Sequence, residues 1–277
     1  MKKVSKKKIV ITGASGLLGS YFFKKYKHKY KIIKYPFRIE NFKKFDKWLN
    51  KKNFDFFIHF AAKTRKKSNK NYKTLQIVNV KSTLNILNTI NKKKIKNFKF
   101  FLFISTSHVY GYSNKSIKEN KIRKPKNTYG KSKKIVEDFI IRNRKRFIFK
   151  IGIARIFNFT GLKQKKGYFV PDIIQKIKKN SFISNINQYR DFIHIDDVSK
   201  SINLILSQQF EKPINISSGN KINLIEVCKI INNLQLKRNI SFDKKRGKDI
   251  FGNNSLLKKL GIKKFKNIHQ ILSSYKK

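Results

Sequence analysis

Short apolar runs alternate with amphipathic segments along the first 150 residues of the chain. The apolar runs show almost no polar alternation, which predicts strands buried on both faces. They occupy residues 8–13, 30–35, 54–62, 98–107 and 147–157. The segments between them carry apolar residues at helical spacing, as in 71–93 with Leu75, Leu84 and Leu87. We therefore predict an α/β fold with a doubly wound parallel sheet.

Beyond residue 157 the alternation is less regular. Helices are expected near 171–179, up to about 208, at 223–234 and at the C-terminus, with apolar stretches at 190–198 and 214–219. No linker separates this part from the first, so the two are expected to pack together. We predict a main domain of residues 1–157, to which 188–210 return, and a smaller C-terminal α/β substrate lobe of 158–187 and 211–277.

The composition is typical of a folded cytoplasmic protein. Of 277 residues, 39% are hydrophobic and 25 are Phe, which is enough for a sizeable core. No apolar run approaches the roughly 20 residues of a membrane span, and the basic start MKKVSKKK leads into a strand, not a signal-peptide core. The single cysteine, Cys228, excludes an internal disulfide and fits a reducing compartment. We expect a cytoplasmic protein with no membrane partner.

The formal net charge of +54 at pH 7 raises the question of a nucleic-acid partner, because basic surfaces bind phosphate backbones. Only ten of the 68 basic residues are Arg, however, and the lysines are spread over the whole chain. A binding face concentrates charge and favours the planar guanidinium. We therefore predict no specific nucleic-acid partner, although the charge can speed the approach of an anionic substrate.

The stretch TGASGLLG at residues 12–19 follows the first strand and opens the first helix. In such a unit Gly13 allows a tight turn, Gly16 the close approach of a pyrophosphate, and Gly19 the packing of the helix on the strand. Backbone N–H groups and the helix dipole attract the anion. The motif predicts a Rossmann-type dinucleotide site, and an ordinary glycine-rich turn is the alternative.

The end of the second strand bears on which dinucleotide binds. An acid that binds the ribose hydroxyls commonly stands there. Here the sequence reads YKIIKYPFRIE, with Glu40 well into the loop and Arg38 just beyond the strand. Because a guanidinium suits a 2′-phosphate, we predict NADP, with NAD as the alternative. The competing interpretation of Arg38 is a solvated loop residue.

Two further stretches point to catalysis. TYGKSK places Tyr129 and Lys133 on one face of a helix, although a lysine-rich chain also produces this spacing by chance. A nearby ammonium stabilises a phenolate, so Lys133 is expected to lower the pKa of Tyr129 and make it a general base or acid. The fourth strand ends in ISTSHVYG, which places the hydroxyls of Thr106 and Ser107 at the carboxyl edge of the sheet. Ligands bind at this edge in open α/β sheets.

Taken together, these motifs resemble the extended short-chain dehydrogenase/reductases, and in particular their NAD(P)-dependent nucleotide-sugar epimerase, dehydratase and reductase group. The resemblance covers almost the whole chain. The matching stretches, in the family's order, are TGASGLLG, IHFAA (58–62), NV (79–80), ISTSHVYG, YGKSK, ARIFNFTG (154–161), RDFIHIDDV, NISSG (215–219) and RGKD (246–249). They are highly specific for the family and much less so for the substrate.

The resemblance implies a role for each matched residue. Tyr129 would be the base, Thr106 the active-site hydroxyl, and Lys133 both a ligand of the nicotinamide ribose and the group that lowers the tyrosine pKa. The implied cofactor-binding residues are Gly13, Ser15, Gly16, Leu17, Gly19, Arg38, Ala61, Ala62, Asn79 and Lys133. The implied substrate-binding residues are His108, Asn158, Arg190 and Arg246. The two arginines would clamp the diphosphate, and plain surface charge is the alternative for them.

Departures from the family's patterns narrow the reaction. The 4,6-dehydratases carry Asp-Glu directly after the active-site Thr, whereas this chain has Ser107 and His108, so elimination of water is not expected. The fucose-forming epimerase-reductases resemble the chain near Arg38, but they have Cys in place of His108 and His where this chain offers Tyr168. We expect His108 to line the pocket without transferring a proton, although imidazole titrates near neutrality.

We predict an NAD(P)-dependent 4-epimerase of a nucleotide-diphosphate sugar, with hydride transfer at C4 through a 4-keto intermediate. The first alternative is an NADPH-dependent reductase of a 4-keto nucleotide sugar. The second, a non-catalytic Rossmann sensor or RNA-associated scaffold, would usually lack the Tyr–Lys pair. The resemblance also implies a homodimer through the helices at 71–93 and 128–146. No metal is expected, because no group has metal-ligand spacing, and four histidines are expected to be structural: His28, His59, His194 and His269.

Overall fold

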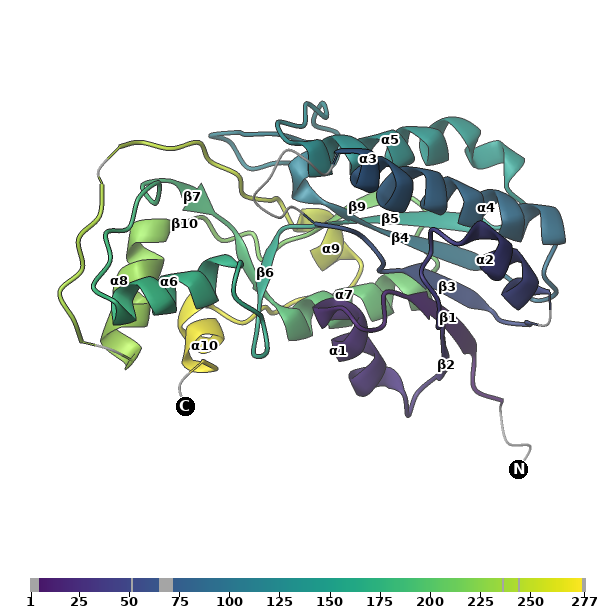
Figure 1. Ribbon diagram of the computed structural model, residues 1–277, viewed down its shortest axis with the longest axis horizontal. Helices are drawn as coiled ribbons and strands as arrows, with labels where there is room; N and C mark the ends of the chain where they lie inside the picture. The colour runs from purple at the N-terminus through teal and green to yellow at the C-terminus, as the bar shows by residue number, and fades with distance from the viewer. Residues whose placement is uncertain (1–4, 51, 65–71, 236, 244, 276–277) are drawn as a thin grey trace.

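A six-stranded parallel sheet forms the centre of the protein (Figure 1). The computed structural model describes residues 5–50, 52–64, 72–235, 237–243 and 245–275. The strand order is β2-β1-β3-β4-β5-β9. The strands are β1 (Lys8–Thr12), β2 (Lys31–Lys34), β3 (Phe56–His59), β4 (Phe100–Thr106), β5 (Lys150–Ile156) and β9 (Pro213–Ile216). The first five confirm the strands predicted from the apolar runs.

Helices cover both faces of this sheet, which confirms the doubly wound fold. One face packs against α1 (Leu17–Tyr26) and α7 (Ile195–Ser207), and the other against α2 (Phe42–Leu49), α4 (Ser82–Lys93) and α5 (Thr128–Asn143). Because of this double cover, every residue of β3 and β4 is buried. Phe57 and Phe101 stack between neighbouring strands at 5.0 Å, and burying each such ring contributes roughly 1.5–3 kcal/mol.

The helix expected over 71–93 is not uniform. A short α3 (Tyr72–Leu75) passes into a π-helical stretch, η2 (Gln76–Lys81), before α4 begins. π-Bulges of this kind often occur at functional sites. Periodicity alone does not reveal the wider turn, because the apolar spacing on either side remains helical.

The carboxyl edge of the sheet gathers the predicted chemistry. Thr12 at the end of β1 pairs with His59 at the end of β3, and Thr106 at the end of β4 pairs with Ile156 of β5. The glycine turn and the turn that follows Thr106 therefore leave the sheet on one edge, as parallel strands require.

The second half of the chain adds a smaller set of elements around its own apolar cluster. The elements are β6 (Asn158–Thr160), paired with β8 (Phe192–His194), and β7 (Tyr189–Arg190), paired with β10 (Ile222–Asn223). They are accompanied by α6 (Phe169–Lys178), α8 (Leu224–Gln235) and α10 (Ile268–Ser273), whereas α9 (Ser255–Lys259) packs against the main sheet through Leu257. β9 lies within the predicted lobe segment 211–277 but pairs with β5, so this stretch joins the main sheet. The division into two domains otherwise stays a prediction.

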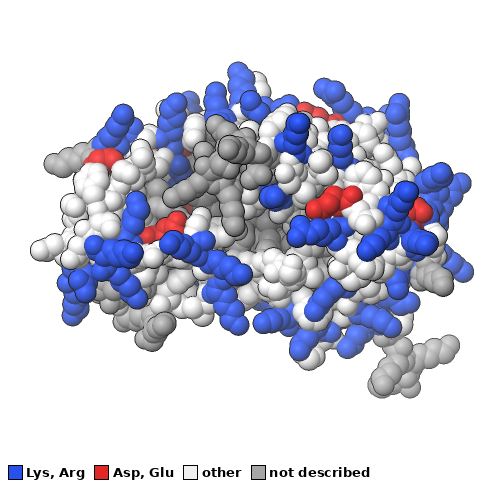
Figure 2. All heavy atoms as spheres, in the orientation of Figure 1, with Lys and Arg blue, Asp and Glu red and all other residues white. Residues whose placement is uncertain are grey.

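Lysine and arginine side chains are distributed over the whole visible face in Figure 2, above both halves of the chain, with few acidic side chains among them. This distribution matches the even spread of lysine along the sequence. In the described part of the chain, no helix has the length and apolar character needed to cross a bilayer.

Candidate active site

The glycine turn has the backbone of an anion site. Gly13 adopts φ +68°, and a Cβ there would lie 2.6 Å from the backbone N of Ala61. A Cβ on Gly19 would collide with the Gly13 carbonyl, so α1 can sit on the turn only without one. Within the described chain, no side chain caps the N-terminus of α1 at Gly16, which leaves backbone N–H groups of the first turn for a ligand. These features fit a dinucleotide pyrophosphate.

The remaining residues of the predicted turn site lie at the same place. Ser15 is exposed on the turn, and Leu17 is the first residue of α1. Ala61 follows β3 and donates its N–H to the Thr12 Oγ1 (3.3 Å), and Ala62 is next to it. The structure thus brings this part of the predicted cofactor site together.

A chain of buried hydrogen bonds runs beneath the turn. The Thr12 Oγ1 lies 2.9 Å from the His59 Nδ1, and the His59 Nε2 lies 3.0 Å from the Thr83 Oγ1. Thr83 gives its only proton to the Asn79 carbonyl (2.8 Å), so it must accept from the imidazole. His59 therefore carries its proton on Nε2 and accepts from Thr12 on Nδ1. This neutral tautomer connects the glycine turn to η2.

Lys133 is buried beside the hydrogen bonds of His59, with 1% of its surface exposed. Its Nζ lies 4.3 Å from the centroid of the Phe103 ring, which in turn stacks on His59 at 6.2 Å. Burial lowers the pKa of Lys133 to about 7, and the carboxylate of Glu137, one helical turn further along α5, opposes that shift. Burial also lowers the pKa of His59 to about 3, with the Lys133 charge adding to the effect. The imidazole thus stays neutral next to the lysine.

Tyr129 lies one turn before Lys133, at the start of α5. Burial raises the pKa of its phenol, and the nearby Tyr168 adds to the rise. The expectation that Lys133 lowers the tyrosine pKa is therefore wrong for this structure, because desolvation of the phenolate outweighs any help from an ammonium that is itself desolvated. The Tyr129 phenol holds its proton at neutral pH.

Thr106 and His108 lie next to Tyr129. Thr106 ends β4, and its Oγ1 accepts the His108 N–H (3.3 Å) at the start of a 3-10 turn, η3 (Ser107–Val109). The His108 ring meets the Tyr129 ring edge-on at 6.2 Å. The start of α5 packs closely against the turn at His108 because residue 130 is a glycine. A Cβ on Gly130 would lie 2.5 Å from the His108 carbonyl oxygen. The predicted catalytic residues are thus brought to one corner.

Asn79 has a role that the sequence did not indicate. Its side chain is buried in η2, where the Oδ1 accepts the Lys63 N–H (2.8 Å). The Nδ2 donates to the Lys63 carbonyl (2.9 Å) and to the Ser132 Oγ (3.1 Å). Asn79 therefore ties the segment after β3 to the catalytic helix, and its contact with a cofactor stays a prediction.

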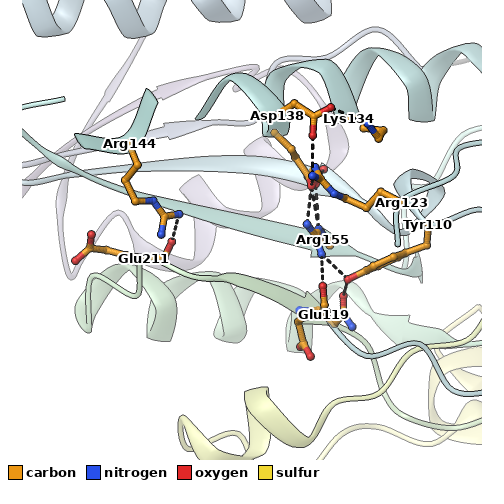
Figure 3. Close-up of polar contacts among 11 residues, drawn as sticks. Tyr110, Glu119, Arg123, Lys134, Asp138, Arg144, Arg155 and Glu211 are labelled. Carbon is orange, nitrogen blue, oxygen red and sulfur yellow. Dashed lines mark hydrogen bonds and ion pairs between the residues drawn. The ribbon is translucent and has the colours of Figure 1, made fainter. Parts of the chain in front are cut away.

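A buried ion cluster behind α5 was also missed (Figure 3). Glu137 accepts from Arg155 of β5 (2.7 Å to Nη2), from Arg123 (3.0 Å) and from the Ser105 hydroxyl (2.5 Å). Arg155 also donates to the Tyr110 hydroxyl at 2.7 Å. The cluster joins β4, β5, α5 and the 110–123 segment. A charged residue within the apolar strand sequence KIGIARI was the signal that could have revealed it.

The two predicted clamp arginines both contact Tyr189, Arg246 through the ring and Arg190 through the backbone carbonyl. Arg246 lies with its Cζ 5.3 Å from the Tyr189 centroid and forms two hydrogen bonds to Asp249 (2.9 and 2.6 Å). Arg190, on β7, donates to the carbonyls of Tyr189 and Lys248, at 2.8 Å each. The structure thus brings the arginines together, with their guanidinium groups largely engaged by the protein.

The last two predicted site residues are Arg38, in the loop after β2, and Asn158, at the start of β6. Arg38 is 88% exposed, with its Nη1 3.7 Å from the Glu40 carboxylate. It lines a cavity after β2 together with Phe37, Glu40, Asn41, Phe42, Lys43 and Lys44. Asn158 begins β6, opposite Phe192. The described residues contain no group of three or more His, Cys, Asp or Glu placed to hold a metal.

A sequence profile of the NAD dependent epimerase/dehydratase family matches residues 9–217, three quarters of the chain. The chain belongs to this family. Its members are NAD(P)-dependent enzymes that act on nucleotide sugars, so the resemblance identified from the motifs is confirmed.

Relatives of this family member have several named activities. The chain is 29% identical over 251 residues to GDP-6-deoxy-D-talose 4-dehydrogenase of Aggregatibacter actinomycetemcomitans, covering 85% of this chain and 84% of the relative. It is 35% identical over 82 residues to CDP-abequose synthase of Salmonella muenchen, covering 28% of each. Among solved structures it resembles RMD from Pseudomonas aeruginosa complexed with NADPH (TM-score 0.83, 22% identity, 97% of both chains). It also resembles UDP-glucose 4-epimerase of Thermotoga maritima (TM-score 0.84, 19% identity, 96% of both chains). The structural likenesses show the shared fold.

Proposed function

We propose that the protein is an NADP-dependent reductase that interconverts a ketone and an alcohol at C4 of a nucleotide-diphosphate sugar. The observation that carries this proposal is the corner formed by Tyr129, Lys133 and Thr106 at the sheet edge that also holds the glycine turn. The relative that aligns with 85% of the chain is named a 4-dehydrogenase, which favours net oxidation or reduction over epimerisation.

Each residue of the proposed active site has its own role in this reaction. A nicotinamide supplies or accepts the hydride when it is bound. Tyr129 donates its proton to the C4 oxygen, a role that suits a phenol whose pKa is raised by burial. Thr106 hydrogen-bonds the same oxygen. Lys133, one helical turn further along α5, would bind the nicotinamide ribose. In the oxidative direction the same groups act in reverse.

NADP is the cofactor we propose, on the basis of charge near the end of β2. Arg38, Lys43 and Lys44 line one cavity there. Arg38 lies in the loop after β2, and the two lysines lie in the first turn of α2. A 2′-phosphate would gain charge-assisted contacts from these cations, which a ribose hydroxyl would not.

We also propose a homodimer through η2, α4 and α5. Ile77 of η2 and Ile135 and Ile141 of α5 are each 41% exposed. Apolar side chains gain free energy when a second copy covers them. Light scattering after size exclusion would give twice the chain mass, and a monomer at micromolar concentration would contradict the dimer.

A panel of sugar nucleotides separates the candidate reactions. Incubation of 4-keto and 4-hydroxy forms with NADPH, NADP, NADH or NAD, followed by mass spectrometry, should show reduction of the keto form with stoichiometric loss of NADPH. Turnover to a 4-epimer without net loss of cofactor would favour the 4-epimerase instead. Tyr129→Phe should lower kcat about 10²–10⁴-fold, as expected for loss of a general acid. Unchanged kcat in that variant would contradict the mechanism.

A further inference from the structure

A third cation, Lys221, contacts the Tyr189 ring that Arg246 also contacts. Lys221 immediately precedes β10, whose antiparallel register places Asn223 opposite Tyr189. The Lys221 Nζ lies 4.2 Å from the Tyr189 centroid and 5.1 Å from that of Phe251. Two aromatic rings therefore hold this ammonium in place, by cation–π attraction.

The arginines of the cluster have already found protein acceptors. The carboxylate of Asp249 accepts two hydrogen bonds from Arg246 and one from the Tyr189 N–H (2.8 Å). Arg190 donates to two carbonyls and to the Gln188 Oε1 (2.7 Å). Both guanidinium groups are thus fixed, and much of their donor capacity is used inside the protein.

Lys221 differs from them in this respect. Among the residues that the structure describes, no acceptor forms a hydrogen bond or ion pair with its ammonium. Asp249 is the nearby acid, and its oxygens are taken by Arg246 and the backbone. Three ammonium donors are therefore positioned by the rings and open to a ligand.

The cluster also lies next to the segment that leaves the catalytic corner. The Ser113 N–H donates to the Asp249 carbonyl (2.8 Å), and the Lys248 Nζ lies 5.8 Å from the Tyr112 centroid. Residues 112–113 follow closely on the turn that begins at Thr106. We therefore expect a ligand that extends from that corner along this segment to reach the cations.

We propose that Lys221 binds the diphosphate of the substrate, with its ammonium donating to the phosphate oxygens while Arg190 and Arg246 supply fixed positive charge. The assignment rests on the proposed function for the identity of the ligand, a nucleoside diphosphate. It adds a contact outside the matched sequence motifs. It also explains why a lysine, with three rotatable donors, stands where the guanidinium groups are already engaged.

Equilibrium binding of nucleoside diphosphates tests this assignment without any turnover. Isothermal titration of UDP, GDP, CDP and dTDP at 0.2 M salt would be carried out on the intact protein, Lys221→Met and Lys221→Arg. The matched control is Lys229→Met, which removes an exposed lysine from α8 in the same half of the chain. Lys221→Met keeps an unbranched aliphatic stem over the rings, and thermal unfolding would verify that each variant is folded.

The best-bound nucleotide should bind Lys221→Met about tenfold more weakly, because a charged hydrogen-bond donor to phosphate is lost. Lys221→Arg should bind within about threefold of the intact protein, and Lys229→Met should bind like it. Equal affinities for the two Met variants, or no binding of any nucleotide by the intact protein, would overturn the proposal. If nucleotide binding depends on Lys221 but no sugar nucleotide is ever turned over, the proposed reductase fails while this site stands.

Discussion

Beside α5, His59 and Glu137 are buried and hydrogen-bonded inside the protein, and Lys133 is buried against the Phe103 ring, whereas around Tyr189 the cations lie near the surface on aromatic rings. Lys133, His59 and Glu137 all belong to the first region. Lys221 and Arg246 belong to the second. Buried charges are costly to leave unpaired, and exposed ones are cheap to keep. The first region is thus suited to fixing geometry for chemistry, and the second to receiving a charged ligand.

The largest effect should come from breaking the buried ion cluster. Glu137→Gln leaves the buried Arg155 without a counter-charge and Arg123 with Asp138 alone, which should lower the free energy of unfolding by about 3–5 kcal/mol. Asp138→Asn, which weakens the half-buried pairs with Lys134 and Arg123 but leaves Glu137 in place, should cost within about 1 kcal/mol. Urea unfolding of both variants measures the contrast. Equal, small losses would show that the buried Glu137 is no costlier to neutralise than its half-exposed neighbour.

The buried hydrogen bonds of His59 to Thr12 and Thr83 provide the next test. His59→Phe keeps a ring between its aromatic neighbours but leaves the buried Thr12 hydroxyl without its acceptor, at a cost of about 1–3 kcal/mol. Affinity for the dinucleotide should fall as well, because Thr12 also holds the Ala61 N–H beside the glycine turn. His28→Phe, on an exposed histidine, is the matched control. Urea unfolding and titration with the dinucleotide should distinguish the two variants. Identical results would show that the Thr12–His59–Thr83 hydrogen bonds support neither stability nor cofactor binding.

Lys133 should make stability depend on pH in a defined window. Its pKa falls from 10.5 to about 7 on folding, so between these values the unfolded chain binds the extra proton. Stability relative to Lys133→Met should therefore rise with pH across this window, by roughly 1.4 kcal/mol per unit. Below about pH 7 both states are protonated and the penalty for the buried charge is complete. Parallel stability curves for the two proteins from pH 7 to 10 would contradict the shift.

The smallest effect is expected at Arg38, in the exposed loop after β2 where we propose that the 2′-phosphate of NADP binds. Arg38→Ser should weaken NADP binding about tenfold and leave NAD binding unchanged, since only NADP carries the phosphate. Its stability should stay within about 0.5 kcal/mol, as for other surface changes. Fluorescence titration with both dinucleotides measures the change in affinity for NADP and for NAD separately. Equal losses for NADP and NAD would assign Arg38 a role other than phosphate selection.

The sequence predicted local features well and long-range partners poorly. The five apolar strands, the glycine turn and the Tyr129–Lys133 spacing depend on residues close together in the chain, where periodicity and turn chemistry act. The pairing of β9 with β5 depends on the tertiary fold, and so does the meeting of Glu137 with Arg155. The raised pKa of Tyr129 was missed for the same reason, because desolvation is a property of the assembled corner.

The central claim is that hydride reaches C4 of a nucleotide sugar while Tyr129 moves the proton. NADPH deuterated at the nicotinamide C4, incubated with a 4-keto nucleotide sugar, should give an alcohol that carries deuterium at its C4. Tyr129→Phe should bind the nucleotide equally well and form this product about 10²–10⁴-fold more slowly. Product without deuterium, or the same rate in both proteins, would contradict the account.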